Sequence, residues 1–397
     1  MTIRGNDSTA ARRRLRLGMV GGGSGAFIGG VHRIAARLDD RYELVAGALS
    51  SDAARARESA RELGIAPERS YDSFAAMARQ EAERADGIDV VAIVTPNHLH
   101  YAAARAFIDA KIHVICDKPL TSKLEDALEL VSAVRQSGVL FALTHNYTGY
   151  PLVRQARALV QAGELGKIRV VQVEYPQDWL TTRLEATGQK QAEWRTDPQR
   201  SGAGGCVGDI GTHAEQLASF ITGLELESVC AQLSTFVDGR ALDDDCQMLL
   251  RYRGGARGML WASQVAPGNE NNLKIRVFGE KAGLTWHQEN PNQLWFSPHG
   301  QPPRLITRGG PGAGPSAAHG TRIPPGHPEG YLEGFANIYS DMAELIGARI
   351  EGREPNPEAL HLPTVVDGAR GMKFIEAAVE SSRRGGEWVS ASLELAP

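Results

Sequence analysis

The sequence lacks the features that mark several classes of protein. It contains only four cysteines among 397 residues, and they show neither the C-x-x-C spacing nor the histidine clusters of zinc sites. We therefore expect no metal centre, and we expect small buried thiols in a reducing compartment. These cysteines are Cys116, Cys206, Cys230 and Cys246. No apolar run approaches the roughly 20 residues that a membrane helix needs.

The chain also lacks a strong excess of charge of either sign. Lys and Arg number 43 against 47 Asp and Glu, which gives a formal net charge of −4 and indicates neither nucleic acid nor an anionic membrane as partner. Arginines 12–14 are followed by a segment too short and too rich in glycine for the apolar core of an export signal. We expect residues 1–13 to be a loose solvated tail of a cytoplasmic protein.

The first part of the chain alternates short apolar runs with helical patterns. The runs LRLGMV, YELVAGAL, IDVVAIVT, IHVICD and VLFALT have strand length, and helix-like stretches between them end at Gly64 and Gly138. Such alternation predicts a doubly wound parallel sheet of Rossmann type over residues 14–145.

Beyond about residue 150 the pattern changes to consecutive hairpins. Turns are expected at Gly254-Gly255 and around residues 281–283, and two helices are expected near 329–350 and 363–383. Residues 146–397 therefore predict an α+β domain with a large, mainly antiparallel open sheet. A chain of this length is too long for one ordinary core, so two domains are expected, with the C-terminal helices packing back on the first.

A glycine-rich turn follows the first predicted strand. Gly21, Gly23 and Ala26 fit the G-x-G-x-x-A form of the dinucleotide fingerprint. Glycines in this pattern let the backbone approach a pyrophosphate at a helix N-terminus. Because the turn follows a strand and opens an alternating α/β domain, the sequence predicts that this domain binds a dinucleotide.

Polar loops follow three further strands of the predicted Rossmann domain. They are VTPNHLH (94–100), CDKPL (116–120) and HNY (145–147). Open α/β sheets bind ligands at the carboxyl ends of their strands, where these loops lie. Lys118 precedes Pro119, which favours an extended backbone at the lysine. An ordinary surface lysine is the simpler interpretation, but its place at the nucleotide crevice favours a functional one.

Residues 202–224, GAGGCVGDIGTHAEQLASFITGL, predict a glycine-rich approach to an amphipathic helix. Four-residue steps back from Leu217 in its apolar stripe reach His213 and then Asp209. The two side chains are interpreted either as a core histidine and a helix cap, or as groups that face a ligand cleft from the first turn. The rest of the stripe consists of Phe220, Ile221 and Leu224.

Together these motifs resemble the Gfo/Idh/MocA family of oxidoreductases over about residues 15–389. The resemblance is carried by GGGSGAFIG, TPNHLH, DKP in place of the commoner Glu-Lys-Pro, GELGKI (163–168) and GDIGTH, which matches the family's D-x-x-x-H pair. In that family a Lys, an Asp and a His form the catalytic group. The resemblance therefore implies catalytic roles for Lys118, Asp209 and His213.

These residue types suit the oxidation of a secondary alcohol, in which a hydride passes to a nicotinamide and the hydroxyl loses a proton. His213 is a candidate general base, since histidine titrates near neutral pH. The Lys118 ammonium would stabilise the developing alkoxide. Asp209 would orient the substrate or keep the lysine charged. In an alternative assignment, Lys118 with a lowered pKa is the base.

The resemblance also implies a nicotinamide dinucleotide cofactor. The family's usual acidic residue after the second strand corresponds to Leu49, and Arg55 is the nearby cation that could hold a 2′-phosphate. We expect both NAD and NADP to be accepted, with NAD slightly favoured. The implied cofactor contacts are Gly21, Gly23, Ser24, Gly25, Ala26, Phe27, Ser50, Ser51, Arg55, Thr95, Pro96, Asn97, His100, Asp117, Lys118 and Asn146.

Segment 176–204, which precedes the GDIGTH helix, is a candidate substrate-binding insertion. Aromatic faces stack on the C–H faces of sugars, and a guanidinium can hold several hydroxyls. The alternative is that the tryptophans fill the domain interface. The candidate substrate contacts are Lys118, Tyr147, Trp179, Trp194, Arg195, Asp209 and His213.

Within the family, DWL, EWRTDPQRSG and HPEGYLEGFANIY resemble the branch that contains levoglucosan dehydrogenase and enzymes oxidising C3 hydroxyls. This implies an NAD(P)-dependent dehydrogenase that converts a sugar, anhydrosugar or glycoside to a keto sugar. The alternatives are a glycoside hydrolase that acts through transient oxidation by NAD, an inositol dehydrogenase, and a non-enzymatic nicotinamide-sensing protein. The resemblance also implies a homodimer or homotetramer formed through the C-terminal sheet.

Eleven of the 21 residues in segment 308–328 are glycine or proline. This composition excludes a helix or a central strand and predicts a long loop. Such a loop is either disordered or functional. In the functional interpretation it covers the substrate cleft of a neighbouring subunit through His319, Arg322, Ile323 and His327.

Overall fold

The computed structural model describes residues 13–395. They form two units, which are treated separately below. The first runs to Thr121 and adds Glu125–Gly149 and Tyr331–Gly368, and the second comprises Ser122–Leu124, Tyr150–Gly330 and the chain from Ala369 onward. The expected tail lies outside the described residues except for Arg13, whose guanidinium donates to both carboxylate oxygens of Asp89 at 2.7 Å. Within residues 13–395, no helix is sufficiently long and apolar to cross a membrane.

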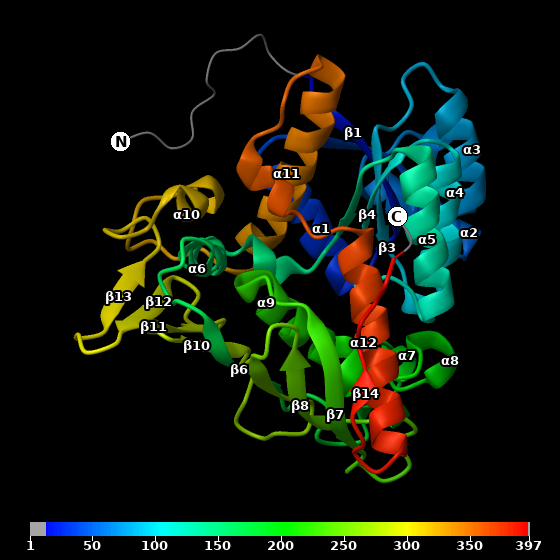
Figure 1. The fold of residues 1–397 in the computed structure, drawn as a ribbon. Helices are drawn as coiled ribbons and strands as arrows, with labels where there is room; N and C mark the ends of the chain where they lie inside the picture. Colours follow the sequence, from blue (N-terminus) through cyan, green and yellow to red (C-terminus); the bar gives the residue numbers. More distant parts are fainter. Residues whose placement is uncertain (1–12, 396–397) are drawn as a thin grey trace. The chain divides into compact units, whose positions relative to one another are not determined.

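The first unit is built on a five-stranded parallel sheet with the order β2-β1-β3-β4-β5. Helix α1 covers one face of this sheet and helices α2 to α5 cover the other (Figure 1). The strands are β1 (Leu15–Gly21), β2 (Tyr42–Ala48), β3 (Val90–Val94), β4 (His113–Cys116) and β5 (Phe141–Leu143). The helices are α1 (Phe27–Leu38), α2 (Ala53–Glu62), α3 (Phe74–Glu83), α4 (His100–Asp109) and α5 (Leu124–Ser137).

Glycines mark the ends of two helices in this unit, and a helix from late in the chain completes its core. Gly64 and Gly138, which follow α2 and α5, both have a φ of +70°, so these helices end at glycines as predicted. Helix α11 (Tyr331–Glu351) packs on α1, and its Phe335, Ile338 and Met342 belong to the same buried core as the strands. The order β2-β1-β3-β4-β5 and the helices on both faces confirm the Rossmann prediction.

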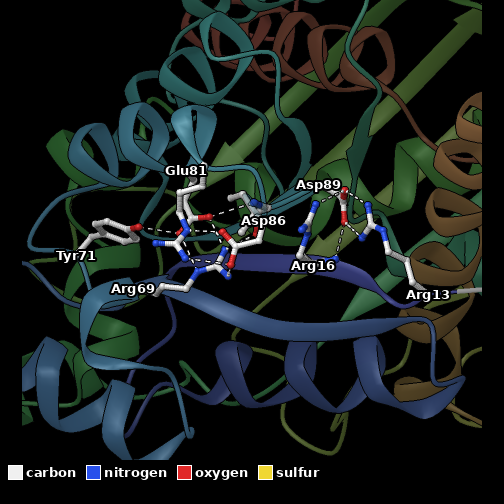
Figure 2. A network of polar contacts seen from close by, with 9 residues as sticks. Arg13, Arg16, Arg69, Tyr71, Glu81, Asp86 and Asp89 are labelled. Atoms are coloured by element: carbon white, nitrogen blue, oxygen red, sulfur yellow. Dashed lines mark hydrogen bonds and ion pairs between the residues drawn. The ribbon is translucent and has the colours of Figure 1, made fainter.

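A buried ion pair joins α3 to the segment that follows α2 (Figure 2). Arg69 donates to both carboxylate oxygens of Glu81, at 3.0 and 2.5 Å. Tyr71 Oη and the Ile88 backbone N–H donate to the same carboxylate at 2.7 and 3.1 Å. Arg69 and Glu81 are 7% and 1% exposed. Since every partner is hydrogen-bonded, the charges are compensated within the core.

The second unit is built on a nine-stranded sheet with the order β13-β12-β11-β10-β6-β9-β8-β7-β14. Neighbouring strands are antiparallel except β6 and β9, which pair in parallel and make the sheet mainly antiparallel, as predicted. The strands are β6 (Ile168–Pro176), β7 (Leu226–Ser234), β8 (Asp245–Tyr252), β9 (Arg257–Ser263), β10 (Lys274–Gly279), β11 (Ala282–His287), β12 (Gln293–Pro298), β13 (Arg304–Thr307) and β14 (Val389–Ser390).

Helices cover one face of this sheet. Helix α9 contacts β6, β9 and β10, and α6 contacts α9, β11 and β12. The buried side chains of β8, which are Cys246, Met248, Leu250 and Tyr252, alternate with more exposed ones, as expected for a sheet with one covered face. The helices are α6 (Pro151–Gln161), α7 (Lys190–Arg195), α8 (Pro198–Ser201), α9 (Thr212–Thr222), α10 (Pro315–Gly320) and α12 (Val365–Arg383), which starts in the first unit.

Two turn predictions have different outcomes. Gly254 and Gly255 join β8 to β9 with φ values of +83° and +98°, as the hairpin prediction requires. The second turn lies at Glu280 and Lys281, one residue earlier than predicted, because Ala282 and Gly283 already belong to β11.

The prediction that segment 308–328 contains no helix is wrong, because α10 lies within it. Helix α10 packs on α6, and Gln155 Oε1 of α6 accepts from Gly314 N–H at 2.6 Å. Arg308, which is 2% exposed, pairs with Glu329 at 2.9 Å and donates to the carbonyl oxygens of Ile323, Pro324 and His327. A glycine- and proline-rich segment is thus held in place by contacts with Arg308 and Gln155 rather than by its own propensities.

Candidate active site

The glycine turn after β1 has the geometry of a cofactor cradle. Gly21, Gly22 and Gly25 have φ values of +76°, +69° and +80°, a backbone region that favours glycine. A Cβ on Gly29 would lie 2.4 Å from Gly22, so this glycine lets α1 pack against the turn. A Cβ on Gly25 would meet no atom within 4 Å, so this side of the turn is open.

Helix α1 starts directly after this turn without a side-chain cap. Its N-cap residue is Ala26, and no side chain at that position bonds to the first turn. Uncapped N–H groups and the positive end of the helix dipole suit an anion such as a pyrophosphate. Phe27, the first residue of α1, is 69% exposed.

The end of β2 carries no acidic side chain at the expected position. Leu49 is buried, while Ser51 and Arg55 are exposed. The Asp52 carboxylate, three residues after Leu49, accepts from Arg55 N–H at 2.8 Å and so caps α2. One oxygen of the nearest carboxylate is therefore engaged in the fold.

Lys118 lies in a turn after β4 that the Rossmann unit holds firmly. The Lys118–Pro119 peptide bond is cis. His100 Nδ1 lies 2.8 Å from the Pro119 carbonyl oxygen, and its Nε2 lies 2.8 Å from the Thr95 carbonyl oxygen. Both ring nitrogens of His100 thus face main-chain oxygens, and the ring links the TPN loop (95–97) to the turn that carries Lys118.

The Asp117 carboxylate next to Lys118 lies at the end of a buried polar chain. Thr144 Oγ1 donates to it at 2.6 Å, His32 Nε2 lies 3.9 Å away, and His32 Nδ1 lies 2.9 Å from Tyr339 Oη. Burial by itself raises the pKa of Asp117, but His32, Thr144 and the Lys118 charge outweigh it, so the pKa lies well below its usual range. Asp117 therefore remains a carboxylate beside the lysine.

His145 is a neighbour of Lys118 that the sequence did not single out. It is buried, and burial together with the positive charge of Lys118 lowers the pKa of His145 to about 3. A neutral imidazole beside the ammonium adds no competing positive charge. The adjoining candidates Asn146 and Tyr147 are also buried in this unit.

Leu217, Phe220 and Ile221 of the predicted apolar stripe are buried, but the prediction of one amphipathic α-helix through Asp209 is wrong. Residues Val207–Gly211 form one turn of π-helix. Only from Thr212 onward is the segment a regular α-helix. Nearly every residue of α9 is buried, because the helix lies between the sheet and α6. Four-residue α-helical spacing thus does not relate Asp209 to His213. His213 is buried, and its ring meets Tyr175 edge-on at 6.4 Å between centroids.

The structure brings several sequence candidates together around Asp209. Arg195 Nε lies 3.2 Å from Asp209 Oδ2, and Gln264 Nε2 donates to the same oxygen at 2.8 Å. The Arg195 guanidinium lies over the Trp194 ring, 4.3 Å from its centroid, and 6.0 Å from that of Trp179. This cluster combines a fixed carboxylate, a planar cation and two indoles in the second unit.

Gln264 was missed because it comes at the end of β9, more than fifty residues after Asp209, with no motif around it. Among residues 13–395, no group of three or more His, Cys, Asp or Glu side chains is arranged to hold a metal ion.

Two family models match the chain. Residues 15–145 match the NAD-binding Rossmann fold of the GFO/IDH/MocA oxidoreductase family, and residues 153–285 match the C-terminal domain of that family. The chain belongs to the Gfo/Idh/MocA family of oxidoreductases. Residues 15–145 are therefore its NAD-binding Rossmann fold, as the glycine turn predicted.

Solved structures of several oxidoreductases resemble this chain over 95% of its length. An oxidoreductase from Sinorhizobium meliloti is 55% identical, with a TM-score of 0.86 over 95% of this chain and 100% of that one. An inositol dehydrogenase homolog from Azotobacter vinelandii, solved with NAD+, is 37% identical, with a TM-score of 0.90 over 95% and 97%. Levoglucosan dehydrogenase, solved with NADH and levoglucosan, is 26% identical, with a TM-score of 0.79 over 95% and 99%.

Proposed function

We propose that this oxidoreductase oxidises a secondary hydroxyl of a sugar, anhydrosugar or glycoside to a keto sugar, with C3 as the expected position. The observation that carries the proposal is the Asp209 cluster, in which Arg195 is paired to the carboxylate and lies over Trp194. Because the pair is neutral as a whole, it suits an uncharged polyol better than an anionic substrate. An indole face beside hydrogen-bonding groups is the usual surface that proteins offer to sugars.

The proposed roles of the chain's own residues follow from their chemistry. The nicotinamide cofactor, when bound, accepts the hydride; the glycine turn and the uncapped start of α1 are the proposed site of its pyrophosphate. Lys118 would donate a hydrogen bond to the reacting hydroxyl oxygen and stabilise its negative charge. His213 would take the hydroxyl proton, and Asp209, fixed by Arg195 and Gln264, would orient the sugar.

A cyclic polyol is the second candidate substrate. The inositol dehydrogenase homolog is more similar to this chain than levoglucosan dehydrogenase is, at 37% against 26% identity. Inositols and pyranoses both present secondary hydroxyls on a six-membered ring, so the same cluster suits both.

A panel of sugars, inositols and glycosides, each incubated with NAD and with NADP, tests the proposal by the absorbance of the reduced nicotinamide. We expect reduction with at least one glycoside or pyranose, and the product should be a keto sugar by NMR. Exclusive activity on inositols would select the second candidate. Release of an aglycone without added cofactor would instead indicate a hydrolase that acts through transient oxidation. Binding of nicotinamide dinucleotides with no turnover of any compound would support a sensing protein.

Cofactor preference is expected to be weak. The buried Leu49 provides no carboxylate to repel a 2′-phosphate, and Arg55 is exposed near the end of β2. We predict that kcat/KM for NAD and NADP differs by less than about 10³-fold, or about 4 kcal/mol, with NAD favoured. Replacing the exposed Ser51, two residues after Leu49, with aspartate should increase the preference for NAD, with Leu38→Asp at the exposed end of α1 as a distant control. A larger preference in the wild type would contradict this assignment.

We also propose that the open face of the large sheet pairs with a second copy of this chain. Five of the exposed large apolar side chains lie on this sheet: Leu249, Met259, Phe278, Trp295 and Leu305. A hollow of about 960 Å³ on the sheet is lined in part by Glu174, Lys274 and Arg276, so the surface carries both signs of charge and suits a two-fold contact. Sedimentation equilibrium should show a dimer or tetramer, and a monomer at micromolar concentration would refute the proposal.

A further inference from the structure

Asp243, a residue outside the predicted site, accepts hydrogen bonds from the start of the helical segment that carries Asp209 and His213. Gly205 N–H donates to Asp243 Oδ1 at 2.6 Å, and Val207 N–H donates to Asp243 Oδ2 at 2.8 Å. Cys206 N–H, between them, donates to the main-chain oxygen of Asp243 at 2.8 Å. Three successive N–H groups thus end on one residue, which is itself buried.

The glycine-rich approach to this helix is what permits the contact. A Cβ on Gly205 would lie 2.2 Å from the Asp243 carbonyl oxygen. A Cβ on Gly204 would lie 2.4 Å from Val207 Cγ1. The glycines of GAGGC therefore let the chain lie directly against Asp243, a function that their sequence pattern alone does not reveal.

The contact continues into the site through the main chain. Asp209 N–H donates to the Gly205 carbonyl oxygen at 2.9 Å, so the first residue bonded to Asp243 is also bonded to Asp209. The first N–H groups of a helical segment have no partner within it, and a carboxylate there is favoured by both hydrogen bonding and the dipole. The carboxylate of Asp243 thus fixes the backbone position of Asp209 within the π-helical segment.

The residue after Asp243 holds the other side of the same cluster. Gln264, whose side chain bonds to Asp209, donates its backbone N–H to the Asp244 carbonyl oxygen at 2.8 Å. The Asp244 carboxylate accepts from Phe236 N–H and pairs with the buried Arg240 at 3.1 Å. Residues 243 and 244 therefore form a rigid support from which both the helix start and Gln264 are positioned.

We propose that Asp243 is a positioning residue, which holds Asp209 and His213 in place through its ionised carboxylate. The inference rests on the proposed catalytic roles of those two residues. It assigns Asp243 no contact with substrate or cofactor. Its effect on turnover is exerted through the backbone of residues 205–209.

The charge state of Asp243 follows from its surroundings. Burial raises the pKa of Asp243 to about 6 against the lowering effect of its backbone hydrogen bonds, and the neighbouring Asp244 raises it further. The Cys206 thiol at the helix start has a pKa raised by burial, by a hydrogen bond with Cys246 and by the charges of Asp243 and Asp245. Below pH 6 one carboxyl oxygen carries the proton, so that oxygen no longer accepts from an N–H group as well as before.

The sign of the effect that Asp243 protonation has on folding stability distinguishes local opening of residues 205–209 from global unfolding. Because the pKa of Asp243 is raised in the fold from 3.8, the native state binds this proton more tightly than the unfolded chain does. Its protonation therefore favours the folded state, and the stability it contributes is lost as pH rises through about 6. Protonation of Asp243 at pH 5 therefore does not promote global unfolding. A loss of hydrogen-exchange protection at residues 205–209 at that pH would have to come from local opening.

Hydrogen exchange in the wild-type protein gives the first test and needs no variant. After correction for intrinsic rates, the amides of Gly205 and Val207 should lose at least about tenfold protection between pH 7 and pH 5. The amides of β1 in the first unit should keep theirs. Equal protection of Gly205 and Val207 at the two pH values would overturn the proposal.

The Asp243→Asn variant gives the second test, with Asp245→Asn as its matched control. Asp245 accepts from Trp261 Nε1 and makes none of the contacts with the helix start described above. In Asp243→Asn we expect kcat to fall at least tenfold, with the Kd for NAD within twofold and the sugar KM within threefold. The acid limb of the kcat profile should also lose one ionisation. Asp245→Asn should remain within threefold of wild type in kcat.

The two tests separate this inference from the proposed function. If no sugar is oxidised, the exchange measurement still decides whether Asp243 holds the helix start. If a sugar is oxidised and Asp243→Asn changes neither kcat nor the protection of residues 205–207, the positioning role is refuted while the function stands. An equal loss of kcat in Asp245→Asn would also refute it, because that residue does not hold the helix start.

Discussion

Replacing Lys118 with methionine should lower kcat at least about 10²-fold while the protein stays folded, and His213→Ala should have an effect of the same size. That is the usual magnitude for removing a group that stabilises a developing charge or transfers a proton. Methionine keeps the length of the lysine stem but cannot donate to the hydroxyl oxygen. The measurement is steady-state turnover of the sugar identified by the substrate panel, with folding checked by circular dichroism.

The controls use residues of the same types at exposed positions. Lys123→Met, five residues after Lys118, and His299→Ala, in the turn after β12, should stay within threefold of wild type. Near-normal turnover in both Lys118→Met and His213→Ala would refute the catalytic assignment. If only Lys118→Met abolishes the pH dependence of kcat, Lys118 rather than His213 is the base.

Lys118→Met also has an expected effect that does not depend on activity. The positive charge of Lys118 helps to lower the pKa of His145 to about 3. Removing that charge should raise the pKa of His145, while burial keeps it below the ordinary histidine value. NMR titration of His145 in the two proteins measures this change, and an unchanged value would show that Lys118 does not face it.

Replacing Glu81 with alanine should destabilise the first unit by about 3–5 kcal/mol. The substitution removes the carboxylate that accepts two hydrogen bonds from the buried Arg69, which keeps only the exposed Asp86 carboxylate at 3.7 Å. It also removes the acceptor of Tyr71 Oη and of Ile88 N–H (Figure 2). Thermal unfolding should show the midpoint of this unit falling by about 10 °C or more. Glu81→Gln, which keeps the shape but not the charge, should lie between the wild type and Glu81→Ala.

Glu83→Ala on the same helix is the matched control for this prediction. Glu83 is exposed at the end of α3, so its replacement should change stability by no more than about 0.5 kcal/mol. If Glu81→Ala and Glu83→Ala lower the midpoint equally, the buried network contributes nothing beyond helix propensity.

The sequence determined the parts of this protein that depend on neighbours along the chain. The alternation of apolar runs and helical patterns gave the Rossmann unit, and glycines at 64, 138, 254 and 255 marked the helix ends and the hairpin. These features are local, because backbone conformation at glycine and the spacing of apolar residues act over a few positions. The motifs also indicated the family, since each joins a fixed spacing to a strand or helix end.

Residues far apart in the chain decided what the sequence could not. The apolar stripe of α9 is buried as predicted, but the helix is not amphipathic, because the sheet and α6 enclose it and nearly every one of its side chains is buried. Asp209 lies in a π-helical segment, which the spacing of apolar residues did not indicate. Segment 308–328 contains a helix since Arg308 and Gln155 hold it, and neither contact is visible from its composition.

The partners of Asp209 show the same division. The sequence by itself selected Asp209, His213, Trp194 and Arg195 as residue types suited to a sugar, and it placed the last two in one short segment. Only the tertiary structure brought Arg195 to Asp209, added Gln264 from the end of β9, and set Asp243 under the start of the helix. Such contacts depend on which strands pair and on which groups are close enough to hydrogen-bond a buried charge. Both are determined by the packing of the whole unit and not by neighbours along the chain.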